Sequence, residues 1–285
     1  MKKFILNLFQ FFILSVVFYV SATLIYGSIL PSEFKPNIKY KLGSYGHLYT
    51  RIKEIEKYTN VDLLFLGSSH AYRGFDTRIF NDNGYKSFNL GSSSQTPIQT
   101  KVLLNRYLEK INPDKVIYEV YPNTLVVDGV ESSVDLISND ENDSHSLKMA
   151  LNINNIITYN TLVYSSVRRA LKMNKSYKEP LSRGKDTYIS GGFVEKEIMF
   201  YKHNTSKKKK RKIKFNEKQT EAFKEIIELL KSKNTEVILV FAPITESNYS
   251  GYSNINYFDS IMNSYSTYYN FNEMMSINDS LHFYD

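Results

Sequence analysis

The fold is decided by residues 61–69, which carry the sequence VDLLFLGSS. A short, continuous apolar run of this kind is typical of a strand buried on both faces of a parallel sheet. Gly67 allows a tight turn after the strand. A serine at a strand-to-helix turn projects its hydroxyl into the crevice of the sheet, where following backbone N–H groups can stabilise an oxyanion. These residues therefore predict both a central strand and a candidate nucleophile.

Further segments along the chain predict strands that join the first one. They are residues 87–90, 115–121 and 236–241. Apolar residues at helical spacing predict helices between these strands. The helices are expected at residues 47–58, 95–110 and 216–233, the last with Asn216 as its N-cap. Because strands alternate with helices, we expect a three-layer α/β/α sandwich with a mainly parallel, flavodoxin-like sheet.

The N-terminal segment predicts a transmembrane helix. Residues 4–30 are apolar, and no charge occurs between Lys3 and Glu33. A spanning helix needs about 20 apolar residues, whereas the core of a cleaved signal peptide has about 7–15. The length therefore favours a retained anchor that ends at Pro31. The competing interpretation is a long signal that is cleaved near residues 21–23.

Charges on either side of the apolar segment predict its orientation. Lys2 and Lys3 precede it, which favours a cytoplasmic N-terminus. Lys35, Lys39 and Lys41 follow it closely and partly offset this bias. We expect a single-pass protein of the cytoplasmic membrane, with its N-terminus inside and the remaining residues extracytoplasmic.

The chain divides into three predicted parts. Residues 1–30 form the anchor, residues 31–60 a connector and helix, and residues 61–285 an α/β domain. Residues 126–214 fit the alternating pattern poorly, because they are polar, rich in Asn and Ser, and only partly helical around residues 147–173. We expect this segment to be an insertion that lies over the sheet.

Composition excludes several classes of chemistry. The chain has no cysteine, which excludes disulfides, thiolate metal sites and a thiol nucleophile. His47, His145 and His203 lack metal-ligand spacing, and no phosphate-binding loop or dinucleotide motif is found, so no metal or cofactor is expected. The net charge of +7 owes much to one basic block at residues 207–212. A nucleic-acid surface would spread such charges, so we interpret the block as a solvated loop and expect no nucleic-acid partner.

The longer motif around the first strand resembles a known family. Residues 64–76, LFLGSSHAYRGFD, resemble the first sequence block of SGNH (GDSL-like) hydrolases, in the Gly-x-Ser-His form found in extracytoplasmic members. Residues 89–91 resemble the second block, and residues 116–123 the third strand and block. Residues 237–243 resemble the strand before the last block, whereas the middle insertion is poorly covered.

The resemblance implies roles for individual residues. Ser69, rather than Ser68, would be the nucleophile and would also contribute to the oxyanion hole. Gly91 would donate its backbone N–H to the oxyanion. Asn123 would be the side-chain donor, although Tyr-Pro-Asn-Thr matches the family's Gly-x-Asn-Asp only loosely.

Two neighbouring residues have less specific interpretations. His70 follows the nucleophile directly, and adjacent side chains diverge at such a turn, so we interpret it as a structural neighbour rather than the base. Glu119 lies near a strand end. It is a candidate for either a substrate contact or a hydrogen-bonded structural acid.

The base and acid of the family come from an Asp-x-x-His block near the C-terminus, and two assignments compete here. Phe283 and Tyr284 precede Asp285, as in the family's Phe-Tyr-Asp-x-x-His segment, which makes Asp285 the acid and leaves the sequence short of the histidine. The flanking aromatic residues favour this assignment. Asp279 and His282 also have the required spacing and are the fallback pair.

Two functions follow from the resemblance. The first is a membrane-anchored ester hydrolase or O-acyltransferase that acts on a cell-envelope polysaccharide through a serine acyl-enzyme. Its partners would be an acylated glycan or an acyl donor. The alternative is a catalytically degenerate envelope or glycan-binding protein that lacks the base histidine.

Overall fold

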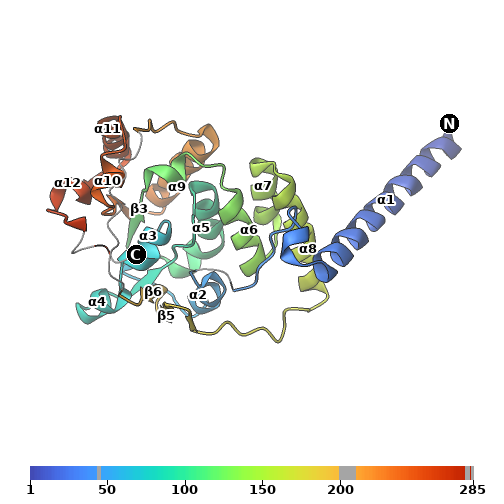
Figure 1. The fold of residues 1–285 in the computed structure, drawn as a ribbon, viewed down its shortest axis with the longest axis horizontal. Coiled ribbons are helices and arrows are strands. Elements are labelled where there is room, and N and C mark those ends of the chain that lie inside the picture. The colour runs from blue at the N-terminus through green and yellow to red at the C-terminus, as the bar shows by residue number, and fades with distance from the viewer. Residues whose placement is uncertain (44–45, 199–209, 280–282, 284–285) are drawn as a thin grey trace.

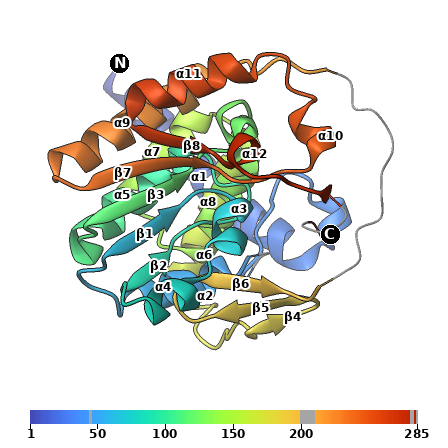
Figure 2. The same ribbon diagram turned by 90° about the vertical axis from the view of Figure 1, so that its left-hand side faces the viewer.

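The computed structural model describes residues 1–43, 46–198, 210–279 and 283. Within them a central sheet has the strand order β2-β1-β3-β7-β8, and every neighbouring pair is parallel (Figure 2). The strands are β1 (Leu63–Leu66), β2 (Ser87–Asn89), β3 (Lys115–Glu119), β7 (Glu236–Phe241) and β8 (Thr267–Asn270). The mainly parallel sheet that the sequence predicts is therefore confirmed.

Helices flank the sheet because alternate side chains of each strand point to opposite faces. Tyr118 of β3 packs on Phe223 of α9 (Glu217–Ser232), at 5.5 Å between ring centroids. Its hydroxyl reaches Thr100 of α5 (Pro97–Ile111). On the other face, Phe65 of β1 stacks on Phe75, which follows α3 (Ser69–Gly74), at 4.7 Å. Both faces of the sheet are thereby removed from water.

The predicted helices and caps agree with the observed ones. The helix expected first is α2 (Leu48–Ile55), and those expected at residues 95–110 and 216–233 are α5 and α9. Asn216 caps α9, since its side chain accepts a hydrogen bond from the Lys218 N–H at 3.0 Å. The edge strand β8 was not predicted, because its sequence TYYN is largely accessible to solvent and forms no apolar run.

The segment between β3 and β7 contains helices and a small antiparallel sheet. The helical elements are η2 (Pro122–Leu125), α6 (Val130–Asn139), α7 (Ser144–Ile153) and α8 (Ile156–Ala170). The sheet consists of β4 (Ser182–Arg183), β5 (Asp186–Ile189) and β6 (Phe193–Lys196), and it was not predicted. It docks beside β2, where the Asn89 N–H donates to the Gly191 carbonyl at 2.7 Å.

The predicted solvated basic block is only partly described. Residues 207–209 lie outside the described residues, and the side chains of residues 210–212 are exposed. The guanidinium of Arg211 lies 4.3 Å from the centre of the Tyr252 ring. The element α4 (Thr77–Asp82) and the C-terminal α10 (Glu246–Tyr249), α11 (Ile255–Tyr265) and α12 (Phe271–Met274) complete the fold around the sheet.

The N-terminal helix α1 (Lys2–Ile29) projects from the body of the protein (Figure 1). Among the described residues it is the helix that is long and apolar enough to cross a membrane. Its C-terminal part packs on α8, where Gly27 leaves room for the ring of Tyr164. After α1 comes the short η1 (Ser32–Phe34), and Lys35 then donates to the Gly27 carbonyl at 2.8 Å.

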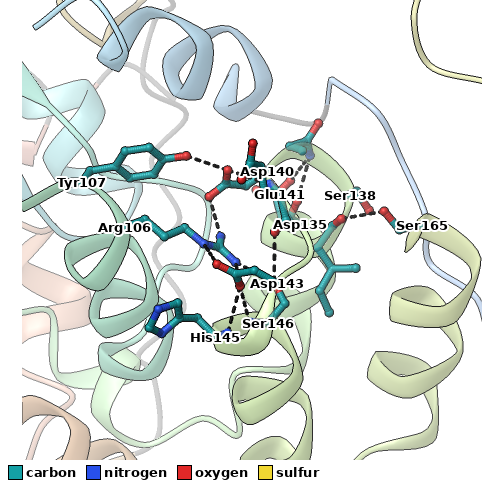
Figure 3. Close-up of polar contacts among 12 residues, drawn as sticks. Arg106, Tyr107, Asp135, Ser138, Asp140, Glu141, Asp143, His145, Ser146 and Ser165 are labelled. Carbon is teal, nitrogen blue, oxygen red and sulfur yellow. Dashed lines mark hydrogen bonds and ion pairs between the residues drawn. The ribbon is translucent and has the colours of Figure 1, made fainter. Parts of the chain in front are cut away.

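A buried ion-pair network joins α5 to the turn between α6 and α7 (Figure 3). The Arg106 guanidinium, 7% exposed, pairs with Asp140 at 2.6 Å and with Asp143 at 2.7 Å. Tyr107 donates its hydroxyl to Asp140 at 2.7 Å, and Ser146 accepts from Arg106 at the same distance. Partial burial would raise the pKa of Asp143, but hydrogen bonds from Arg106 and Ser146 lower it to about 2. The network therefore fixes α6 and α7 relative to α5.

Replacing Arg106 with methionine should destabilise the protein by about 3–5 kcal/mol, because the buried carboxylate of Asp140 would lose its cation. Urea denaturation of the purified protein measures this change. Lys101→Met is the matched control on the same helix. Its pair with Glu225 is exposed to solvent, so its loss should cost no more than about 1 kcal/mol. Equal losses in the two variants would contradict the assigned role.

Candidate active site

The predicted nucleophile lies at a strand-to-helix turn, as expected. Strand β1 ends at Leu66, Ser68 caps α3, and Ser69 is the first residue of that helix. The side chain of Ser68 accepts a hydrogen bond from the His70 N–H at 3.3 Å. Ser69 is half-buried. The Ser69 hydroxyl has no hydrogen-bond partner among the residues that the structure describes.

Gly67 lets the chain leave β1 in a conformation that other residues avoid. Its φ is +135°, and a Cβ atom there would lie 2.7 Å from the Glu119 Cβ and 2.9 Å from the Glu119 carbonyl oxygen. The Glu119 Cβ and carbonyl oxygen are held by the backbone of β3, so they cannot rotate away from an added methyl group. Glycine at this position therefore permits the close approach of β3 to the turn that carries Ser69.

Glu119, at the end of β3, anchors the same turn. Its side chain is 1% exposed. Oε2 accepts hydrogen bonds from the backbone N–H of Ser68 at 3.0 Å and from the Ser68 hydroxyl at 2.8 Å. Oε1 lies 3.4 Å from Nδ1 of His70. Of the two interpretations left open by the sequence, these contacts support the hydrogen-bonded structural acid.

His70 and Ser69 line the same cavity, which has a volume of about 240 Å³. The His70 side chain is 32% exposed, and its ring meets Tyr121 edge to face at 4.6 Å between centroids. The sequence predicted His70 as a structural neighbour of Ser69 and did not indicate that it lines the cavity. The sequence did not show that the buried carboxylate of Glu119 lies next to His70, because this contact arises only from the pairing of β3 with β1.

The cavity is built from segments that are far apart in the sequence. Besides α3, its lining includes Ser94 after β2, Asn123 after β3, and Gly129 and Glu131 at the start of α6. Pockets that enclose drug-sized ligands typically have roughly 300–1,000 Å³, so this cavity suits a smaller group. It lies at the carboxyl ends of parallel strands, where open α/β sheets bind ligands.

The predicted oxyanion donors differ in where they lie. Asn123 lines the cavity, and its side chain is exposed. Gly91 is buried, and its N–H donates to Oδ1 of Asn89 at 3.1 Å. A Cβ at Gly91 would lie 3.1 Å from the Ser68 carbonyl oxygen, so glycine permits close packing against the nucleophile turn. The Gly91 N–H could donate to an oxyanion only after its hydrogen bond to Asn89 is broken. The oxyanion roles of Gly91 and Asn123 stay predictions.

The predicted acid and base at the C-terminus are mostly outside the described residues. His282 and Asp285 belong to the parts that the structure does not describe. Asp279 is described, and its Oδ1 accepts a hydrogen bond from the Glu246 N–H at 2.9 Å, at the start of α10. Asp279 does not belong to the described lining of the cavity. The described residues contain no group of three or more His, Asp or Glu side chains that could hold a metal ion.

Comparison with known proteins finds low similarity to solved structures, including two from Bacteroides species. One is a protein named as an acylhydrolase from Bacteroides fragilis NCTC 9343, with 11% identity, a TM-score of 0.37, and coverage of 83% of this chain and 82% of that chain. The other is a GDSL-like lipase from Bacteroides thetaiotaomicron VPI-5482, with 11% identity, a TM-score of 0.34, and coverage of 83% of each chain. No family model and no curated protein matches the sequence. Similarity this low transfers no residue's role to this chain.

Replacing Gly67 with alanine should cost at least about 3 kcal/mol, because a left-handed φ and an overlap with β3 add together. The matched control is Gly84→Ala. Gly84 also has a positive φ, +84°, but a Cβ there would meet open space. The control should lose about 1–2 kcal/mol from backbone strain alone. Chemical denaturation of both variants gives the comparison, and similar losses would show that the approach of β3 is not tight.

Proposed function

We propose that this protein is a serine-dependent ester hydrolase or O-acyltransferase of the SGNH type. The observation that carries the proposal is the place of Ser69, half-buried at the first position of α3 and facing a cavity at the carboxyl ends of the strands. The turn is held by Glu119, which orders Ser68 and His70 on either side of the nucleophile. The sequence blocks around Ser69, Gly91 and Asn123 support the same assignment.

The proposed reaction has two steps. The Ser69 hydroxyl attacks the carbonyl carbon of an ester while a base takes its proton, and the resulting oxyanion is stabilised by N–H donors at the turn. The alcohol leaves with a proton, and an acyl group stays on Ser69. A water molecule then releases the acid, or a hydroxyl of a second substrate takes the acyl group. A cavity of about 240 Å³ fits a small acyl group.

Two histidines compete as the base. His70 lines the cavity, and Glu119 lies against its Nδ1 in the way that an acid orients a catalytic imidazole. His282 belongs to the C-terminal block that the family resemblance implies, with Asp279 as its acid. In the first case the triad would be assembled from α3 and β3 alone.

The proposed location follows from α1. Residues 4–30 would cross the cytoplasmic membrane with Lys2 and Lys3 inside, which leaves the α/β domain outside. An anchored extracytoplasmic esterase would meet acylated glycans of the cell envelope, and these are the proposed substrates or acceptors.

A second function is a glycan-binding protein without catalysis. It is favoured by one observation, namely that no described residue hydrogen-bonds the Ser69 hydroxyl. Binding of an acetylated glycan without reaction at Ser69 would support this alternative.

Ser69→Ala should abolish covalent labelling by a fluorophosphonate and hydrolysis of p-nitrophenyl acetate, because the neighbouring Ser68 hydroxyl is buried and donates to Glu119. Intact-mass spectrometry of the full chain in detergent measures the label. The matched control is Ser144→Ala, since Ser144 is also the first residue of a helix, α7, but is exposed and outside the cavity lining. Unchanged labelling of Ser69→Ala would overturn the proposal.

The base is assigned by comparing His70→Gln with His282→Gln in the same assay. Loss of the base should slow acylation by about 10²–10⁴-fold. A slow His70→Gln variant places the base in the cavity, whereas a slow His282→Gln variant places it in the C-terminal segment. If the parent protein is not labelled, the binding function replaces catalysis.

Glu119→Gln should lower kcat by about 10–100-fold with little change in KM, because the Ser68–His70 turn would lose its ionic acceptor. The variant also leaves buried groups imperfectly paired, at a cost of about 1–3 kcal/mol in stability. Glu236→Gln, at an exposed pair with Lys115, is the control and should change neither quantity. A Glu119→Gln protein that is destabilised but fully active would limit Glu119 to a structural role.

A further inference from the structure

The last turns of α1 are attached to α8 rather than free. The hydroxyl of Tyr19 donates to the side chain of Asn160, near the start of α8. Further along α1, Ser28 hydrogen-bonds the Tyr164 hydroxyl at 3.3 Å. The side chains before Tyr19 are exposed, with Phe18 at 76%. The part of α1 that is free of the protein body therefore ends near residue 18.

The free part of α1 is too short to cross a bilayer alone. Residues 4–18 would be about 22 Å long at about 1.5 Å per residue. The hydrocarbon core is about 30 Å thick and takes about 20 residues. Counted from Phe4, such a span reaches Thr23, which lies beyond the contact between Tyr19 and Asn160. A membrane crossed by α1 must therefore extend to the level of the first turns of α8.

The junction of α7 with this end of α8 carries apolar side chains that are exposed. Leu147 and Leu151 of α7 are 51% and 58% exposed, and Ile156 at the start of α8 is 53% exposed. Leu147 and Leu151 are four residues apart and so share one helix face. We call Leu147, Leu151 and Ile156 the α7–α8 corner. Figure 1 shows α7 and α8 beside the point where α1 leaves the body.

The contacts also show which end of α8 faces the membrane. Tyr19 contacts Asn160, whereas Gly27 contacts Tyr164. The two helices therefore run in the same direction. The N-terminus of α8, with its junction to α7, lies toward the N-terminal part of α1 and so toward the bilayer. Lys148 is exposed between the two leucines in sequence and would meet lipid headgroups.

We propose that the α7–α8 corner inserts into the interface of the bilayer that α1 spans, so that the domain is held to the membrane at two places. The occupant of this apolar surface is lipid. The inference rests on the proposed membrane attachment of α1. Its consequence is a fixed tilt of the domain, because α6, which lines the Ser69 cavity, packs against α7 and α8.

Tryptophan fluorescence tests the proposal directly, because the chain contains no tryptophan. Single variants of the full chain would be reconstituted into vesicles of phosphatidylcholine and phosphatidylglycerol, with or without bromine on the acyl chains. Phe12→Trp reports the anchor, and Leu151→Trp reports the corner. Ile79→Trp, on α4 and 61% exposed, is the control at the end of the molecule away from α1 (Figure 1).

We expect bromine to quench Phe12→Trp strongly and Leu151→Trp at least about twofold, since interfacial residues lie about 5–10 Å deep. Ile79→Trp should not be quenched. If only Phe12→Trp is quenched, the anchor stands and the corner proposal fails; if neither is quenched, both fail. A blue-shifted but unquenched Leu151→Trp would mean that protein covers the corner, which also overturns the proposal. Leu147→Trp repeats the test on the same face.

Discussion

The candidate site depends on one buried carboxylate. Glu119 lies at the end of β3 with a side chain that is 1% exposed, and it accepts two hydrogen bonds from Ser68. A buried charge is tolerated only where it is well paired, so the Gly67–Ser68–Ser69 turn must keep its conformation for the carboxylate to remain satisfied. The same carboxylate touches His70. One side chain therefore couples the register of β1 and β3 to the position of Ser69, the proposed nucleophile.

A second constraint fixes the wall of the cavity opposite α3. Gly129 and Glu131, at the start of α6, line the cavity, and the other end of α6 is held by the Arg106 network through Asp140. The helix is thus fixed to the sheet through α5. Because α6 also packs on α8, it connects the cavity to the helix that contacts α1. The proposed chemistry and the proposed membrane attachment meet in the segment that the sequence marked only as an insertion.

Much of the fold was predictable because its signals are local. The strands β1, β3 and β7 are rich in apolar residues, and the N-cap of α9 and the glycine before Ser68 and Ser69 are encoded within a few residues. Strand β8 was not predictable, because most of its side chains reach solvent and its partner β7 is distant in sequence. The β4–β6 sheet was not predictable, because its strands are very short and mix polar with apolar side chains. A strand at a sheet edge buries few of its side chains, so the alternation of apolar and polar residues along it is too weak to predict the strand.

The sequence by itself determined the parallel sheet, the apolar N-terminal helix and the position of Ser69 at a strand-to-helix turn. Only the tertiary structure decided what surrounds Ser69. Ser94, Asn123 and His70 reach one cavity because the ends of β2, β3 and β1 meet at the same edge of a parallel sheet. Likewise, only packing shows that Glu119 faces Ser68 and that α1 lies along α8. Contacts between distant segments depend on register and crossing geometry, which no local pattern of residues specifies.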